Sequence, residues 1–126
     1  MDTRMNKAAA LYNFYSKFLP AYEENSVPDD AELPYITYQV ALDNFTGTAQ
    51  QLTASIWYRD TSWAQITKKA EEIREDISRG GTIEKCDGGR IWITRGQPFA
   101  QYMADDTKDE VKRIVLNISA EFITAE

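Results

Sequence analysis

The fold is decided by residues 34–79, which read PYITYQVALDNFTGTAQQLTASIWYRDTSWAQITKKAEEIREDISR. Apolar side chains alternate with polar or small ones in 35–42 and again in 51–58. Alternation gives a pleated strand one apolar face, so the pattern predicts two strands. The turn formers of 43–48, DNFTGT, predict a hairpin loop between them. The side chains expected on the apolar face are Ile36, Tyr38, Val40, Leu42, Leu52, Ala54, Ile56 and Tyr58.

A helix is predicted to follow this hairpin and cover its apolar face. The side-chain oxygens of residues 60–62, Asp-Thr-Ser, can accept hydrogen bonds from the free N–H groups of a helix start. Arg79 suits the negative end of the helix, and Gly80 and Gly81 can adopt the left-handed conformation that ends helices. Apolar residues recur between these signals at spacings of three and four, namely Trp63, Ile66, Ala70, Ile73 and Ile77.

A second amphipathic helix is predicted over residues 3–19, with Pro20 as its stop. Its apolar stripe consists of Ala8, Leu11, Tyr15 and Phe18, widened by Tyr12 and Leu19. Core packing explains the stripe, and the alternative is that Phe14 or Tyr12 faces a partner. Residues 21–33 are acidic and aperiodic, so an exposed loop is expected there, with ordering against a basic neighbour as the alternative.

Three more strands are predicted in the C-terminal part. Segments 82–86 and 90–95 are joined by Asp-Gly-Gly, a hairpin signal that places Ile83, Ile91 and Ile93 inward. Trp92 then points to the opposite face, where it is either packed by another element or part of a contact surface. Residues 96–98 break the strand, and 99–106 are expected to form a loop or short turn.

Residues 109–124 alternate cleanly and predict a last strand of unusual length. One of its ends could therefore pair outside its own subunit. Taken together, the elements predict an α+β protein with a mostly antiparallel sheet of about four to five strands and two main helices. Their order is helix, two strands, helix, three strands, in a single domain spanning residues 1–126.

Composition argues against several kinds of chemistry. The chain has no His and one Cys, Cys86, so Ser-His-Asp and Cys-His arrangements and an intramolecular disulfide are excluded. Adjacent acids at 29–30 and 105–106 lack the ligand spacing of a calcium loop. We expect no enzymatic activity, no catalytic residues, no cofactor and no metal. The sequence also has no apolar run that predicts a signal peptide or a membrane span, so a soluble cytoplasmic product is expected.

The formal net charge of −6 argues against a stable grip on nucleic acid, which requires clustered Lys and Arg. Contact with DNA in passing stays open, because a local basic lining could exist within an acidic total. The nearest candidates for such a lining are the pair Arg90 and Arg95 or the pair Lys68 and Lys69. The alternative is that these side chains belong to ordinary solvated surface.

The chain resembles the tail terminator, or tail completion, proteins of long-tailed bacteriophages. The resemblance is carried by the N-terminal helix, by the strand opening LPYITY at 33–38, by IWYRD at 56–60 leading into the second helix, and by the long alternating last strand. It implies a non-enzymatic structural protein of the virion, located at the tail end or neck and assembled in the host cytoplasm. Such a protein forms a ring, expected to be a hexamer, that caps the tail tube and joins it to the head connector.

The partners implied by this resemblance are other copies of the chain, the major tail tube protein and the head-completion or connector protein. DNA would only pass through the lumen, and no membrane is involved. Interface candidates were chosen from the pattern of large side chains, and they are Trp57, Trp92, Phe99, Tyr102, Met103, Phe122 and Ile123. The acidic segment 23–32 is expected to face the lumen or the tube. The alternatives are another neck or head-closure component, and a monomeric ligand-binding or enzymatic α+β domain with a pocket between helix and sheet.

Overall fold

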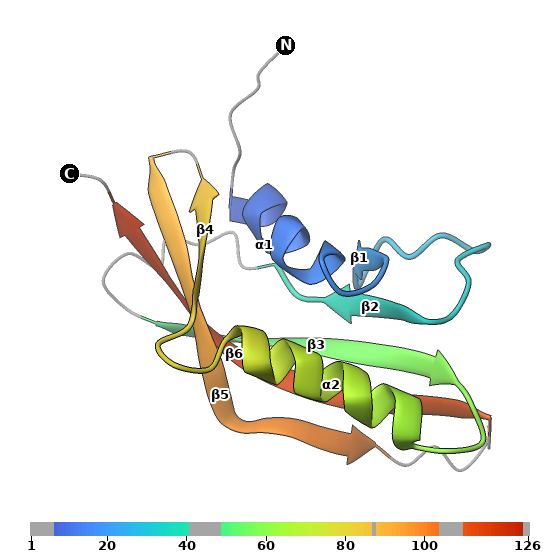
Figure 1. Cartoon of the computed structure of the whole chain (residues 1–126). Coiled ribbons are helices and arrows are strands. Elements are labelled where there is room, and N and C mark those ends of the chain that lie inside the picture. The colour runs from blue at the N-terminus through green and yellow to red at the C-terminus, as the bar shows by residue number, and fades with distance from the viewer. Residues whose placement is uncertain (1–6, 41–48, 87, 104–109, 125–126) are drawn as a thin grey trace.

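The computed structural model describes residues 7–40, 49–86, 88–103 and 110–124, which form an α+β structure with two helices and six strands (Figure 1). A single mixed sheet contains all six strands in the order β1-β2-β3-β6-β5-β4. Only β1 and β2 pair in parallel, and the other neighbours are antiparallel. Along the chain the elements are α1 (Lys7–Ser16), β1 (Ala21–Glu23), β2 (Tyr35–Tyr38), β3 (Gln50–Arg59), α2 (Ala64–Asp76), β4 (Thr82–Cys86), β5 (Gly89–Met103) and β6 (Val111–Thr124).

The α+β class and the two helices confirm the prediction, while the number of strands exceeds the four to five expected. The additional strand is β1, which lies in the acidic segment predicted to be a loop. The amide of Ile36 donates to the carbonyl of Pro20, and the amide of Glu24 donates to the carbonyl of Tyr38. These bonds hold a three-residue strand too short to show a pattern of its own. Strand β2 ends at Tyr38, and the predicted turn at 43–48 lies outside the described residues.

Strand β6 lies at the centre of the sheet, and this position explains its length. It pairs with β3 from Val111 to Ala120 and with β5 from Arg113 to Thr124. Its far end, with Phe122 opposite Ile91, is therefore paired within the same chain. Pairing within the chain accounts for the length of β6, so no strand of another subunit is needed to explain it.

Strand β5 continues to Met103, so the predicted loop at 99–106 is wrong for residues 99–103. Pairing with β6 shifts between Arg95, opposite Ile118, and Ala100, opposite Leu116. Four residues of β5 thus face the single residue Asn117, which is a large bulge. The side-chain amide of Asn117 donates to the carbonyl of Pro98 at 2.8 Å and ties the bulge to β6.

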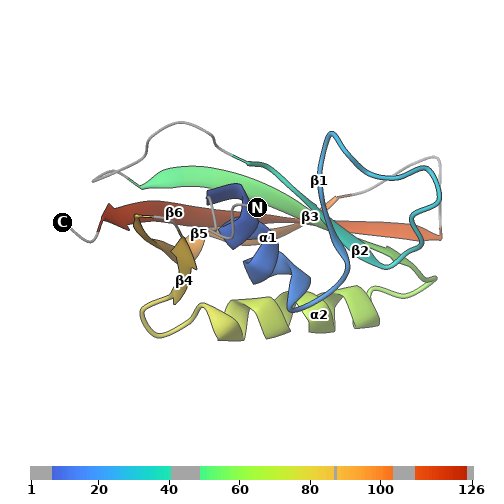
Figure 2. The same ribbon diagram turned by 90° about the horizontal axis from the view of Figure 1, so that it is seen from above.

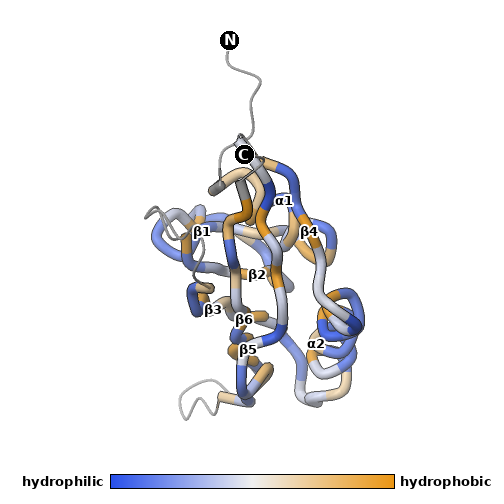
Figure 3. The backbone as a smooth tube through the Cα atoms, turned by 90° about the vertical axis from the view of Figure 1, so that its left-hand side faces the viewer, coloured by the Kyte–Doolittle hydropathy of each residue, from blue (hydrophilic) through white to orange (hydrophobic). Residues whose placement is uncertain are grey.

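Both helices cover the same face of the sheet, as Figure 2 shows. Helix α1 contacts β1 and β4, and α2 contacts β3, β5 and β6. In α1, Phe14 is fully buried, which decides against a partner-facing role, whereas Tyr12 is 48% exposed. Figure 3 shows α2 as a largely hydrophilic tube with few hydrophobic positions, as expected of a helix that buries one stripe. The buried residues of α2 are Ile66, Ala70 and Ile73, as predicted.

The ends of α2 follow the predicted signals closely. The amide of Ala64 donates to Oγ of Ser62 at 3.0 Å, and the amide of Ser62 donates to Oδ1 of Asp60 at 3.1 Å. After the helix, Arg79, Gly80 and Gly81 all have positive φ, so the chain reverses there into β4. Neither α1 nor α2 has the length and apolar character needed to span a lipid bilayer.

One inward position of the C-terminal hairpin was predicted wrongly. Ile91 and Ile93 are fully buried as expected, but Ile83 is 53% exposed. Ile83 lies opposite Trp92, so the two side chains share the face away from the helices. The physical reason is the hairpin length, because Cys86 pairs with Gly89 rather than with Arg90. This difference of one residue reverses the face to which β4 side chains point.

Candidate interaction surfaces

The sheet face opposite α1 and α2 is open in the part of the chain that the structure describes (Figure 2). Alternate residues of β2, β3, β6 and β5 supply its side chains. One row crosses four strands in register, since Tyr35 lies opposite Trp57, Trp57 opposite Arg113, and Arg113 opposite Met103. Tyr22 of β1 extends this row, with its ring 5.6 Å from that of Tyr35 in an edge-to-face arrangement. The open face therefore carries three aromatic rings in a row, followed by one guanidinium and one methionine.

The side chain of Trp57 is fixed within this row by polar contacts. Its indole N–H donates to Oγ1 of Thr37 at 2.9 Å, and Cζ of Arg113 lies 4.8 Å from the centre of its rings. Nε of Arg113 also donates to Oγ of Ser55 at 3.0 Å. Ser55 is only 6% exposed although it belongs to the open face, because the Arg113 side chain lies against it. Trp57, a predicted interface residue, is thus half-buried and held in one orientation.

A second group of large side chains lies at the other end of the open face. Trp92 is 37% exposed, and its indole N–H donates to the carbonyl of Gly80. Ile83 and Glu121 flank it on the neighbouring strands. Ile123, the next outward residue of β6, lies opposite Arg90 and is 37% exposed. Trp92 and Ile123 are consequently surface residues of the same face, and Trp92 lies on the outer face where alternation places it.

The remaining predicted interface residues are divided among different environments. Met103 is 40% exposed and belongs to the open face, opposite Arg113. Phe122 is 8% exposed and part of the hydrophobic core, so it is removed from the set of surface candidates. Phe99 is half-buried against the core. The alternation of the last strand places Phe122 on the apolar face with Ile114 and Leu116, and only its size made it an interface candidate.

Tyr102 lies on the helix-covered side, near the N-terminal part of α2. Its hydroxyl is 2.8 Å from Oγ1 of Thr67, and its ring centre is 4.7 Å from that of Trp63. A shallow pocket of about 210 Å³ adjoins it, lined by Thr67, Ala70, Glu71, Ala100, Tyr102 and Ile114. This pocket is small and half open, and it lies between the exposed segment of β5 and the helix.

A larger hollow of about 530 Å³ borders β1 at the end of the sheet. Its walls combine prolines and an aromatic ring with two carboxylates. Such a lining suits the aliphatic stem and charged head of a Lys or Arg side chain. The lining residues are Pro20, Tyr22, Asp30, Ala31, Glu32, Leu33 and Pro34.

Ionisable groups in the core consist of tyrosines rather than carboxylates. Burial raises the pKa of the Tyr15 hydroxyl above its usual range, and the nearby Tyr38 adds to the shift. The two rings stack with centres 4.8 Å apart, and the Tyr15 hydroxyl has no hydrogen-bond partner among the described residues. Burial also raises the pKa of Tyr38 and of Tyr58. Within the described ranges, no three Cys, Asp or Glu side chains are grouped so that they could hold a metal ion.

Alternation places Thr37 and Arg113 on the outward faces of their strands, but neither was counted among the interface residues. Tyr22 was missed because it lies in the segment predicted to be a loop. Comparison with known proteins finds no family model that matches the chain and no curated protein that is similar to it.

Proposed function

We propose that this protein is a structural virion assembly protein that forms a ring on the end of a bacteriophage tail tube and joins it to the head connector. The observation that carries the proposal is the open sheet face, which presents Met103 at 40% exposure in the row of the fixed Trp57, and Trp92 and Ile123 at 37% each at its other end. Large side chains of this kind are concentrated where proteins contact one another. The resemblance of the sequence to tail terminator proteins supports the same assignment.

The open face suits a contact with another protein better than a site for a small ligand. Trp57 and Arg113 are held in place by hydrogen bonds before any partner arrives, so these two side chains lose little freedom on binding. A ring requires a heterologous contact, in which one patch of each copy meets a different patch of the next. The partners that follow are further copies of the chain, the tail tube protein and the head connector, while DNA passes through the lumen.

The proposal is tested by measuring the mass of the purified protein by light scattering after size exclusion, with electron microscopy of the eluted material. Both measurements are made over a range of concentrations, with and without tail tube protein. We expect concentration-dependent association into rings, which the tube protein promotes. A protein that stays a monomer at high concentration, and also beside the tube protein, contradicts the proposal.

The same material distinguishes the end of the tail from other positions in the neck. Rings are mixed separately with tail tube and with purified connector, and bound material is sedimented. Capping of the tube and arrest of its growth are expected for a tail terminator. Rings that bind the connector and ignore the tube would instead assign a head-closure role.

A further inference from the structure

The outer edge of β5 is unprotected over residues 99–103. Strand β4 pairs with β5 only as far as Ile93, and beyond that point β5 has a described neighbour only on its β6 side. The edge segment reads FAQYM, and its last four residues are all exposed. It contains no charge and no proline, which are the usual devices against edge-to-edge pairing. Such an edge offers unpaired backbone groups to another extended segment.

The opposite end of the sheet is formed by β1, four strands away from β5 in the order of the sheet. At a spacing of about 4.8 Å between strands, the two edges are roughly 19 Å apart along the sheet. Strand β1 pairs only with β2 among the described residues, so its other edge is also open. Each copy therefore has two different open edges, on opposite sides of the molecule.

The two ends differ in charge. The segment from residue 18 to residue 58 contains six acids and no Lys or Arg. Five of these acids lie at 23–32, beside β1, and none has an ion pair among the described residues. Glu24, Asp29, Asp30 and Glu32 are exposed. The β1 end is therefore an acidic surface without compensating cations nearby.

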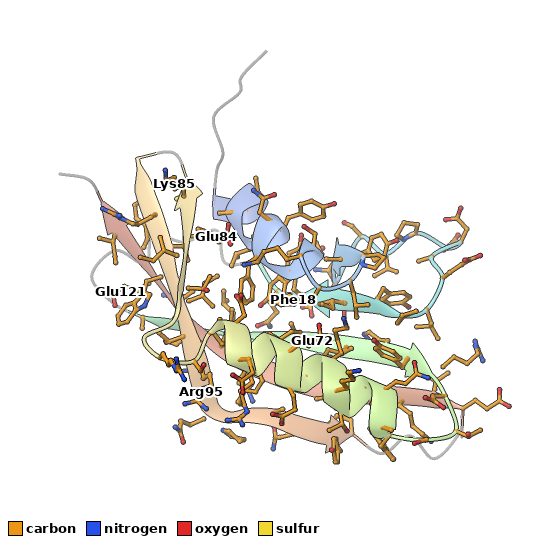
Figure 4. The ribbon with its side chains drawn as sticks, in the orientation of Figure 1. Phe18, Glu72, Glu84, Lys85, Arg95 and Glu121 are labelled. Carbon is orange, nitrogen blue, oxygen red and sulfur yellow. The ribbon has the colours of Figure 1, made fainter. Side chains whose placement is uncertain are left out.

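The other end of the sheet, formed by β4 and β5 and called the β4–β5 end, is basic. Arg79, Lys85, Arg90 and Arg95 are all exposed there, and none has an ion pair with a described residue. Lys85 and Arg95 lie on this side of the molecule in Figure 4. The carboxylate of Glu84 in β4 forms an ion pair with Nζ of Lys17 in α1 at 3.4 Å. Opposite charge at opposite edges favours contact between unlike ends of two copies and disfavours contact between like ends.

We propose that the β1 end of one copy docks on the β4–β5 end of the next, so that copies associate head to tail. This inference rests on the proposed function, because such a contact is the heterologous interface that a ring requires. The free edge of β5 receives the extended chain at β1, and the hollow lined by Asp30 and Glu32 receives a basic side chain of the neighbour, with Arg95 as the first candidate. The acidic segment then faces the neighbouring copy, in place of the lumen or tube expected from the sequence.

Charge reversal at each end tests the pairing. One variant carries Asp30→Lys and Glu32→Lys, and the other carries Arg90→Glu and Arg95→Glu. Each variant alone places like charges in every contact, so its association constant should fall by about 100-fold or more relative to the unmodified chain. In an equal mixture, the unchanged β1 end of the second variant meets the unchanged β4–β5 end of the first, and the two reversed ends also attract. The mixture should therefore recover rings in which the variants alternate.

A matched control carries Glu72→Lys and Glu75→Lys on the exposed side of α2, and neither residue lines the hollow beside β1 or the pocket beside the free edge of β5. It makes the same change in net charge as the first variant and should assemble normally. Circular dichroism and thermal unfolding establish that all variants are folded. Association is followed by light scattering and electron microscopy, and it should weaken as salt is raised.

Two results overturn the inference while leaving the proposed function intact. One is that both reversed variants form rings as readily as the unmodified chain. The other is that each fails alone and the equal mixture also fails, since the two ends then do not contact each other. If the unmodified chain forms no rings even beside tail tube protein, the proposed function fails, and the inference fails with it.

Discussion

The two faces of the sheet are built from the same strands, yet they differ in nearly every physical property. On the helix-covered face, Ile56, Ile114 and Leu116 are fully buried in the hydrophobic core. On the open face, the residues between them, such as Trp57 and Arg113, are half-buried and linked by hydrogen bonds and ring contacts. Stability is thus concentrated on one face, and the capacity for recognition on the other. Successive residues of a strand point to opposite faces, so a side chain's place in this alternation alone decides whether it serves stability or recognition.

The largest effect expected from this comparison is at the centre of the covered face. Ile114→Ala removes a fully buried side chain between β3 and β5 and should lower the free energy of unfolding by about 2 to 5 kcal/mol. The adjacent Val115→Ala, on the open face, is the matched control and should cost no more than about 1 kcal/mol. Urea unfolding of both variants measures the difference. Equal losses would show that the open face is covered in the free protein.

A smaller effect is expected from breaking the polar contacts of the open face. Arg113→Ala removes the hydrogen bond to Ser55 and the cation–ring contact with Trp57, so we expect a loss of about 1 to 2 kcal/mol. Arg113→Lys keeps the charge and most of the stem, and should lose less. The indole of Trp57 should also become more mobile, which fluorescence anisotropy reports once Trp63 and Trp92 are replaced by Phe. Unchanged stability and anisotropy in Arg113→Ala would mean that the row is not held by this arginine.

An effect of opposite sign is expected at Tyr15, on the covered side. Its fully buried hydroxyl has no hydrogen-bond partner among the described residues, so Tyr15→Phe should raise stability by about 1 kcal/mol. Tyr38→Phe on the stacked neighbour serves as the comparison. Loss of stability in Tyr15→Phe would reveal a partner for the hydroxyl.

The same hydroxyl predicts that the free energy of unfolding falls at alkaline pH. Because burial raises the pKa of Tyr15 in the folded chain, the folded state holds its proton more tightly than the unfolded state. The contribution of Tyr15 to the free energy of unfolding is therefore fully present below the ordinary tyrosine pKa of about 10, and it is lost as the pH rises above that value. Thermal unfolding between pH 8 and 11 measures this loss, and Tyr15→Phe should flatten the curve. Tyr38 and Tyr58, whose pKa values are also raised by burial, add to the slope.

The smallest change in stability, and the most specific change in assembly, is expected at Trp92. Trp92→Ala removes a ring that is 37% exposed and one hydrogen bond to Gly80, so the monomer should stay folded with a loss of about 1 kcal/mol or less. Association should weaken, whereas Thr94→Ala on the same strand should leave it unchanged. Light scattering and thermal unfolding are measured on both. Loss of cooperative unfolding in Trp92→Ala would mean that this residue belongs to the core.

The covered face could be predicted from the sequence because its period is regular over long stretches. Ile56, Ile66, Ile73 and Ile114 are all buried where alternation or the helical stripe placed them. Strand β1 could not be predicted, since three residues show no period and their pairing depends on β2, which lies eleven residues further along the chain. Ile83 was placed on the wrong face because the length of its hairpin loop differs by one residue from the expected one.

The candidate surface was predictable in part. Trp92 was placed on the correct face, since it alternates with the buried Ile91 and Ile93 on a regular strand. Tyr102 and Met103 lie beyond the bulge, where the shift of pairing reverses the relation between residue number and face. Tyr102 thereby turns toward α2, and Met103 toward the open face. The fixed row at Trp57 depends on contacts across three strands, which no local pattern encodes.

The bulge between Arg95 and Ala100 has a consequence for changes in chain length. A Cβ atom added at Gly96 would lie 2.9 Å from the backbone of Asn117. The chain of β5 can therefore approach β6 this closely only at a glycine. Residues 96–99 face the single residue Asn117, so one residue inserted or deleted at 97–99 should change the size of the bulge and leave the pairing of 100–103, and the sides of Tyr102 and Met103, unchanged. Related chains should therefore vary in length here more freely than in the paired segments on either side, and an edge grafted onto β5 keeps its faces as long as its pairing with β6 is kept.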